Sequence, residues 1–324
     1  MKKILITGGA GYLGSKLCKF LEKNYKIDVI DDLWFKTNSI KEPNKLIKID
    51  IKNFDFNKVI KSNYYAVIFL SGLSNDPMAK LSPDLNFEHN LNITASFLYK
   101  LTNSNIKKVI FGSSCSVYGN TKGSIVNEQS EIGVSYSYGI SKFLIDTMIM
   151  QLNKFSKITQ FYSLRQGTIC GNSPKMRFDL IINKMVKDAI KEKKIILNSK
   201  RVWRPILDID DACKIYKFFL RKNPKKGIYN ILSYNSQISV IANTIKKYFK
   251  KKRNIEIEII NKNKTELRNY KVSRRKLDKV FKHKYKTVED TIHNIYENIK
   301  SYKNLDLDKY INILMFKKKF RIKK

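Results

Sequence analysis

Two residues near the middle of the chain have a spacing that could support proton transfer. Tyr138 and Lys142 are four positions apart in a segment with helical periodicity, so their side chains share one helix face. A free tyrosine titrates at about 10 and is a poor base, but a neighbouring ammonium group favours the phenolate and lowers the tyrosine pKa. Ser114 could hold a substrate hydroxyl or a developing oxyanion beside that tyrosine. These residues predict proton abstraction from an alcohol, with a half-exposed helix pair as the structural alternative.

A glycine-rich stretch near the N-terminus predicts a binding site for a diphosphate. The apolar run at residues 4–6 indicates a buried parallel strand, and helical periodicity begins at Tyr12. The glycines between them fit either Gly9-x-Gly11-x-x-Gly14 or Gly8-x-x-Gly11-x-x-Gly14. In this context they allow a tight turn, close approach of a pyrophosphate and close packing of the helix, whose free amides face the phosphates. The expected cofactor contacts in this stretch are Gly8, Gly11, Tyr12, Leu13 and Gly14.

Carboxylates at the ends of the next two predicted strands could select the cofactor. Asp31 is placed to accept a hydrogen bond from a ribose 2′-hydroxyl and would repel a 2′-phosphate, which predicts NAD rather than NADP. Asp32 could take the same role, and Lys36 leaves NADP open. Asp50 and Ile51 close the following strand and are expected near the adenine.

The elements that must position these residues alternate between strand and helix. Further strands are expected at residues 27–31, 45–50, 65–71, 107–113 and 159–164, with helices at 55–62, 84–103 and 136–153. Repeated βα units with apolar strands indicate the α/β class and a doubly wound parallel sheet of the Rossmann type, which binds ligands at the carboxyl ends of its strands. We expect residues 1–165 to form this domain and residues 166–324 to form a smaller substrate lobe, from which residues 205–232 return to the sheet.

Small and polar residues follow two of these strands. The segment Leu70-Ser71-Gly72 suits the close approach of a cofactor, and Ser113 and Ser114 end the strand at 107–113. The polar loop that begins at Ser74 either lines the mouth of a substrate site or is a plain connection. All of these residues are expected at the same edge of the sheet.

With these motifs, the chain resembles the extended short-chain dehydrogenases/reductases of the nucleotide-sugar epimerase/dehydratase group along nearly its whole length. The resemblance rests on the glycine-rich stretch, Asp31, Asp50-Ile51, Asn90, the segment Ser113-Ser-Cys-Ser-Val-Tyr-Gly119, Tyr138 and Lys142. It implies that Ser114, Tyr138 and Lys142 are the catalytic set, that Lys142 also holds the nicotinamide ribose, and that Asn90 lies near the cofactor. It further implies NAD as the cofactor and a homodimer built on the helices at 84–103 and 136–153.

Arginines of the second half are candidates for binding the diphosphate of a nucleotide sugar. Arg177, Arg204 and Arg268 stand out in a chain whose cations are mostly lysine, and a guanidinium group can bind phosphate through two hydrogen bonds. Arg204 and Arg268 match positions that hold the diphosphate in similar enzymes, and Thr168 lies in the turn toward the substrate lobe. A surface salt bridge is the alternative for each arginine.

Two departures from the family pattern bear on the reaction. Ser114 is followed by Cys115 and Ser116, where 4,6-dehydratases have an acidic pair, so we expect no carboxylate placed to eliminate water and disfavour a dehydratase. Cys115 could transfer a proton, as a cysteine does in some similar multi-step epimerases, but its position differs from theirs by one residue, so we expect a buried packing thiol. Asp208 stands where many relatives have histidine, which leaves the local hydrogen bonding open.

The predicted function is that of an NAD-dependent nucleotide-sugar epimerase. Tyr138 takes the proton of the sugar C4 hydroxyl while hydride passes to the nicotinamide, and the keto sugar then takes the hydride back on its other face. A 4-dehydrogenase or 4-ketoreductase of a heptose or deoxysugar pathway would use the same residues and stop halfway. A third reading is a protein that has lost catalysis and contacts RNA through its positive surface.

The formal net charge of +36 could signal a nucleic acid or an anionic membrane. The cations are spread over the chain without an arginine–aromatic cluster, so we favour a solvated lysine surface and expect no specific nucleic acid. One segment differs from this even spread of cations: the basic tail at residues 316–324, which follows the apolar stretch 310–315. A weak contact with an anionic membrane is one reading of this tail, and a frayed end is the favoured one.

The chain is expected to be a cytoplasmic protein without a metal. No apolar run reaches the length of about 20 residues that a membrane span needs. The four cysteines are far apart and have no metal-ligand spacing, which fits a reducing compartment.

Overall fold

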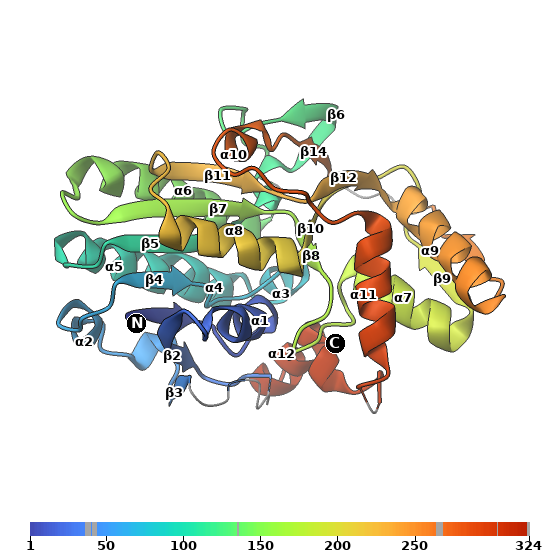
Figure 1. Cartoon of the computed structure of the whole chain (residues 1–324), viewed down its shortest axis with the longest axis horizontal. Coiled ribbons are helices and arrows are strands. Elements are labelled where there is room, and N and C mark those ends of the chain that lie inside the picture. Colours follow the sequence, from blue (N-terminus) through green and yellow to red (C-terminus); the bar gives the residue numbers. More distant parts are fainter. Residues whose placement is uncertain (36–39, 41–43, 135, 264–267, 303, 323–324) are drawn as a thin grey trace.

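The computed structural model describes residues 1–35, 40, 44–134, 136–263, 268–302 and 304–322, and within them a seven-stranded parallel sheet forms the centre of the molecule (Figure 1). Its strand order is β11-β7-β5-β4-β1-β2-β3. The strands are β1 (Lys2–Thr7), β2 (Tyr25–Asp31), β3 (Lys45–Lys48), β4 (Ala66–Phe69), β5 (Lys108–Ser114), β7 (Gln160–Gln166) and β11 (Gly227–Ile231). The predicted α/β class with a doubly wound sheet is confirmed. Lys36 lies outside the described residues.

Alternating side chains of the central strands pack against helices on opposite faces of the sheet. On β1, Ile4 and Ile6 belong to a core with α1 (Tyr12–Leu21) and α8 (Ile209–Arg221), whereas Leu5 belongs to a core with α5 (Ile93–Lys100) and α6 (Ser137–Phe155). Figure 1 shows α1 and α8 on one side of the sheet and α5 and α6 on the other. Both faces are therefore buried, which explains why the strands are continuous apolar runs.

The helix expected at residues 84–103 is not continuous. It consists of α4 (Pro83–Phe87), a π-helical turn at Glu88–Asn92, α5 and a 3-10 turn at Leu101–Asn103. The wide turn surrounds Asn90, whose side chain bonds to Asn86 on α4 and to the backbone of Leu73. A π-helical turn of this kind is common next to functional sites. The helix expected at 55–62 is the short α2 (Asn57–Ile60).

The second half of the chain forms smaller sheets and a group of helices beside the large sheet. β11 is the part of this half that pairs with the large sheet, along β7. The smaller sheets contain β8 (Thr168–Cys170), β10 (Trp203–Asp208) and β12 (Tyr234–Gln237); β9 (Lys194–Leu197) and β13 (Glu258–Asn261); and β6 (Asn120–Val126) and β14 (Asn269–Val272). The remaining helices are α3 (Asp76–Leu81), α7 (Ile181–Glu192), α9 (Ile238–Arg253), α10 (Arg275–Asp278), α11 (Val288–Ile299) and α12 (Asn312–Phe320).

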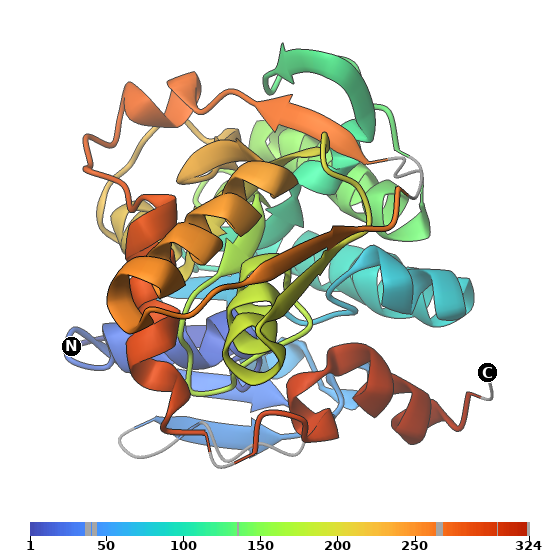
Figure 2. The same ribbon diagram turned by 90° about the vertical axis from the view of Figure 1, so that its right-hand side faces the viewer.

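The expectation of a frayed C-terminal tail is wrong for the described part of that tail. Residues Asn312–Phe320 form helix α12, and the side chain of Phe316 is only 1% exposed. Figure 2 shows α12 near the C-terminus, beside segments from the first hundred residues. Its partners Leu73 and Met78 come from the loop after β4 and from α3, far away in sequence, so the tail alone did not reveal them. In the described part of the chain, no helix is long and apolar enough to span a bilayer.

Candidate active site

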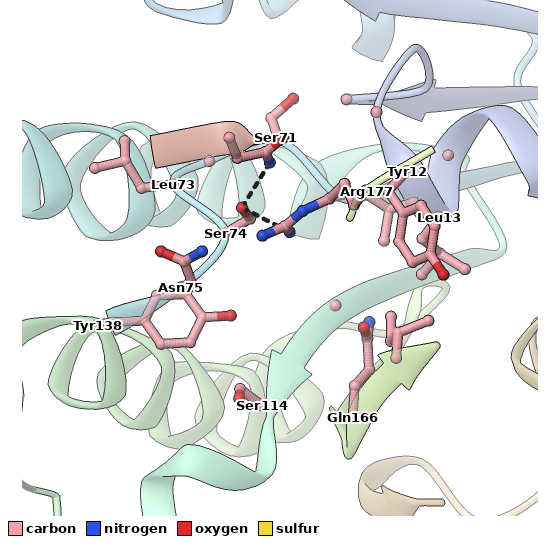
Figure 3. Close-up of a pocket in the computed structure, with 18 of the residues that line it drawn as sticks. Tyr12, Leu13, Ser71, Leu73, Ser74, Asn75, Ser114, Tyr138, Gln166 and Arg177 are labelled. Atoms are coloured by element: carbon pink, nitrogen blue, oxygen red, sulfur yellow. Dashed lines mark hydrogen bonds between the residues drawn. The ribbon is translucent and has the colours of Figure 1, made fainter. Parts of the chain in front are cut away.

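The carboxyl ends of the central strands open into a cavity of ≈ 400 Å³ (Figure 3). All of the predicted cofactor, catalytic and substrate residues line it except Asn90. They are Gly8, Gly11, Tyr12, Leu13, Gly14, Asp31, Asp50, Ile51, Leu70, Ser71, Gly72, Ser74, Ser113, Ser114, Tyr138, Lys142, Thr168, Arg177, Arg204 and Arg268. The fold thus brings residues from both halves of the chain to one site, whereas their individual roles stay predictions.

The glycine-rich turn between β1 and α1 forms a cradle that only glycine permits. Gly8 has a φ of 69°, a conformation that side chains rarely adopt, and its amide donates to the carbonyl of Ile30 at 2.8 Å. A Cβ atom at Gly14 would lie 2.4 Å from the Gly8 carbonyl oxygen. Of the two glycines that could begin the predicted pattern, Gly8 has the positive φ and Gly9 does not. Within the described residues no side chain caps the start of α1, so its first amides face the cavity side of the turn and fit a diphosphate.

Asp31 both lines the cavity and holds the glycine-rich turn. One carboxylate oxygen accepts from the Ala10 amide at 3.0 Å, and the other accepts from the Leu33 amide at 2.8 Å. Burial raises the pKa of the Asp31 carboxyl, and these two hydrogen bonds oppose the rise. Asp32 also lines the cavity, and burial together with the charge of Asp31 raises its pKa to about 7. A ribose hydroxyl would thus meet at least one acceptor here.

Asn90 acts from behind the cavity wall. It is 1% exposed, and its amide accepts from the Leu73 amide at 2.8 Å while donating to the Leu73 carbonyl at 3.0 Å. The adjacent Gly72 has a φ of 134°, and a Cβ atom there would lie 2.1 Å from the Asn90 side-chain oxygen. Asn90 therefore shapes the turn that presents Gly72, and its predicted place near the cofactor stays a prediction.

The three predicted catalytic side chains lie around one part of the cavity. The Tyr138 hydroxyl points into it (Figure 3). Lys142 Nζ donates to the Gly112 carbonyl at 2.8 Å and lies 5.7 Å from the centre of the Tyr138 ring. Ser114 Oγ lies 2.8 Å from Ser116 Oγ, a neighbour that sequence reasoning did not include. Ser113 Oγ is buried without a hydrogen-bond partner among the described residues, which suits a site built for a further polar ligand.

Burial dominates the electrostatics of this set. It lowers the pKa of Lys142 to about 8. It also raises the pKa of Tyr138 above its ordinary value; the charge of Asp76 adds to the rise, and Ser114 and Arg177 oppose it. The net direction for Tyr138 is upward, contrary to the expected effect of the lysine. A positive charge bound nearby would oppose this rise in the pKa of Tyr138.

The arginines line the cavity as members of internal networks and not as surface salt bridges. Arg177 is 5% exposed, binds the carboxylate of Asp179 through two hydrogen bonds of 2.9 and 2.7 Å, and donates to Ser74 Oγ at 3.1 Å. Arg204 is also 5% exposed and donates to the carbonyl of Arg268. Their guanidinium groups are thus held in fixed orientations at the cavity wall.

A carboxylate that sequence reasoning missed enters the site from α3. Asp76 lines the cavity, is 7% exposed and accepts from Arg268 at 2.8 Å. Positions 115 and 116 supply no carboxylate, as expected, and whether Asp76 could take part in removing water stays untested. The available signal was the segment Asn75-Asp-Pro77, because Asn75 accepts from the Met78 amide and begins α3. Other missed lining residues include Gln166, Tyr270 and Asn312.

The two departures from the family pattern have structural explanations. Cys115 is buried, its thiol faces the Arg165 carbonyl at 3.2 Å, and the described residues that line the cavity do not include it. The expectation of a packing thiol is confirmed. Asp208 accepts from the Asp210 amide at 2.9 Å and from Thr291 Oγ1 at 2.8 Å, so it caps α8 in the protein interior. Burial raises its pKa to about 6.

Comparisons with known proteins agree with this geometry. An ADP-L-glycero-D-manno-heptose-6-epimerase of Brachyspira hyodysenteriae is 29% identical over 268 residues, which are 76% of this chain and 81% of that protein. A UDP-glucose 4-epimerase of Bacillus subtilis is 30% identical over 165 residues, 46% of this chain and 48% of that protein.

Solved structures share the fold. The UDP-N-acetylglucosamine 4-epimerase from Methanobrevibacter ruminantium, 20% identical, has a TM-score of 0.82 over 93% of this chain and 99% of that one. The UDP-glucuronic acid 4-epimerase from Bacillus cereus in complex with UDP-glucuronic acid and NAD, 22% identical, has a TM-score of 0.80 over 92% and 99%. A model of the NAD-dependent epimerase/dehydratase family matches residues 4–231, more than half of the chain. The chain therefore belongs to this family of NAD-dependent enzymes, which are extended short-chain dehydrogenases/reductases.

Proposed function

We propose that this enzyme is a nucleotide-sugar 4-epimerase. The observation that carries the proposal is the single cavity that brings Ser114, Tyr138 and Lys142 together with the glycine-rich turn and with three arginines. A base that faces both a dinucleotide site and a cationic wall suits oxidation of a sugar that is attached to a nucleotide diphosphate. The curated relatives named above are, by their names, epimerases of UDP- and ADP-linked sugars, which supports this substrate class.

In the proposed reaction each part of the site has one task. The amides of the glycine-rich turn hold the cofactor pyrophosphate, and Asp31 accepts from the adenosine ribose. NAD supplies the hydride acceptor when bound, together with a positive ring that favours the phenolate of Tyr138 against the effect of burial. Tyr138 then takes the C4 hydroxyl proton, Ser114 orients that hydroxyl, and Lys142 holds the nicotinamide ribose.

The second half of the chain would hold the substrate diphosphate. Arg177 and Arg204 are buried at the cavity wall, where a guanidinium group could donate hydrogen bonds to phosphate oxygens. Arg268 lies in the same wall and is paired with Asp76. Because the Arg177 guanidinium is fixed by Asp179, little rotamer entropy is lost when a phosphate binds beside it.

The test is incubation of the enzyme and NAD with UDP-, GDP-, CDP- and ADP-sugars, followed by product analysis. We expect the C4 epimer of one of these sugars to appear without net cofactor reduction. A persistent 4-keto product with stoichiometric NADH would instead assign the 4-dehydrogenase or 4-ketoreductase reaction. A product that has lost water would assign a dehydratase and would direct attention to Asp76. Binding of RNA together with no conversion of any of these sugars would overturn all three.

We also propose a homodimer built on α5 and α6. Tyr99 on α5 and Leu144 and Phe155 on α6 are 65%, 41% and 74% exposed, and the two on α6 fall on one helix face. Burying them against a second copy would remove apolar surface from water. We expect light scattering at micromolar concentration to give a dimer mass, and Phe155→Glu to shift it toward the monomer. A monomeric unmodified chain would contradict this interface.

A further inference from the structure

Helix α12 covers the cavity from the C-terminal end of the chain. Phe316 packs against Leu73 and Met78, and the Trp34 ring lies 5.0 Å from the Phe320 ring, centre to centre. Leu73 and Trp34 both line the cavity and follow β4 and β2. In Figure 3 the ribbon of α12 runs next to Leu73. The helix therefore packs against two segments of the cavity wall.

A chain of buried polar contacts leads from α12 to the substrate wall. Lys175 Nζ donates to Asn312 Oδ1 at 2.9 Å and to the Lys309 carbonyl at 2.8 Å. Asn312 Nδ2 donates to Ser74 Oγ at 3.2 Å, and Ser74 Oγ also accepts from Arg177 at 3.1 Å. Lys175 and Asn312 are 2% and 3% exposed, and Asn312 itself lines the cavity.

The donor and acceptor capacities of these groups determine the direction of each hydrogen bond. Burial lowers the pKa of Lys175 to about 7. In its ammonium form this side chain has only donors, and the Asn312 amide then turns its oxygen to Lys175 and its nitrogen to Ser74. A hydroxyl has two acceptor sites and one donor. Both acceptor sites of Ser74 are occupied by Asn312 and Arg177, and among the described residues its proton meets only the weak acceptor Met78 Sδ, at 3.7 Å. The Ser74 hydroxyl is therefore presented as a donor.

We propose that Asn312 is a positioning residue that makes Ser74 a hydrogen-bond donor to an oxygen acceptor of the substrate. The inference rests on the proposed nucleotide-sugar function. The acceptor is either a diphosphate oxygen or a sugar oxygen, because Ser74 is exposed to the cavity between Arg177 and the neighbouring Asn75 (Figure 3). Helix α12 is then a wall of the substrate site, and its sequence takes part in recognition.

The substitution Asn312→Asp tests this directly. The carboxylate has the same shape and keeps Lys175 as a partner, but it cannot donate to Ser74 and accepts the Ser74 proton instead. We expect the Kd of the nucleotide ligand, measured by calorimetry with NAD present, to rise about ten- to hundredfold if the lost hydrogen bond goes to a charged diphosphate oxygen, and about tenfold or less if it goes to a neutral sugar oxygen. The Kd of NAD and the melting temperature should stay unchanged, which a general loss of structure would not allow.

The probes are UDP and UDP-glucose, together with any sugar that turns over in the panel. Weaker binding of UDP assigns the Ser74 bond to the diphosphate, and weaker binding of UDP-glucose alone assigns it to the sugar. Unchanged binding of both would overturn the role of Asn312. An unmodified enzyme that binds NAD but none of these ligands would instead overturn the proposed function, and the positioning role with it.

Two further variants make the test specific. In a Ser74→Ala background, Asn312→Asp should add little, because the two changes remove the same bond. Additive losses would show that Asn312 does not act through Ser74. Asn304→Asp is the matched control, because it makes the same chemical change at an exposed position outside the cavity, where the side-chain oxygen accepts from the Asp306 amide. It should leave all binding constants unchanged.

Discussion

Replacing Tyr138 by phenylalanine is expected to lower kcat by about 10²- to 10⁴-fold while NAD still binds. The ring and its packing are kept, and the contact of Lys142 with the Gly112 carbonyl does not involve the hydroxyl. The variant loses a hydroxyl group that points into the cavity and has the Lys142 ammonium group near its ring. Steady-state kinetics on the sugar identified in the panel, with NAD binding measured separately, give the result.

Tyr136→Phe is the control for this experiment. Tyr136 immediately precedes α6, and its ring lies 5.6 Å from the Lys80 ammonium group. The described lining of the cavity does not include it. The Tyr136→Phe variant should therefore keep near-normal turnover. Near-normal turnover of Tyr138→Phe as well would refute the assignment of the base, whereas a loss of NAD binding would show that the effect is structural.

Replacing Asp146 by asparagine is expected to lower the free energy of unfolding by about 3–5 kcal/mol. Asp146 and Arg165 form a buried ion pair of 2.7 Å, with side chains 0% and 2% exposed. Ser163 also donates to this carboxylate, and Arg165 donates to the Tyr118 hydroxyl at 2.8 Å. Without the carboxylate a guanidinium charge would remain buried between α6 and β7, and the amide cannot neutralise it.

The measurement is the midpoint and slope of unfolding in urea. Glu258→Gln provides the contrast, because the pair of Glu258 with Lys194 is exposed and is expected to matter little. Asp146 also lies one turn beyond Lys142 on α6 and raises the pKa of that lysine. We therefore expect the folded variant to lose the Lys142 charge at a lower pH. An unfolding free energy within error of the unmodified chain would contradict the role of the pair.

Much of the nucleotide-binding half could be predicted because its signals are local. The strand at the N-terminus is an apolar run, and the turn after it needs glycine at position 8 for a positive φ. Asp31 closes the second strand, and the parallel sheet brings this strand end beside that turn, where its carboxylate accepts the Ala10 amide. Each of these features depends on a few neighbouring residues and on the period of the strand. The same holds for Tyr138 and Lys142, which share a face of one helix.

The features that the sequence did not reveal depend on partners far away in sequence. The π-helical turn within the segment 84–103 contains Asn90, whose side chain bonds to the backbone of Leu73, and nothing in this segment indicates that partner. Asp76 becomes part of the site because α3 places it opposite Arg268, nearly two hundred residues later. The basic tail was expected to fray, yet Phe316 has its apolar partners in the loop after β4 and in α3.

The sequence alone determined the family, the cofactor and the set of residues at the strand ends, because short motifs and the period of the strands carry that information. Only the tertiary structure decided how those residues are charged and oriented. Burial raises the pKa of Tyr138, Asp179 fixes Arg177, and α12 reaches Ser74 through Asn312. The physical reason is that desolvation and hydrogen-bond direction depend on every group packed nearby, and folding brings those groups together from distant parts of the chain.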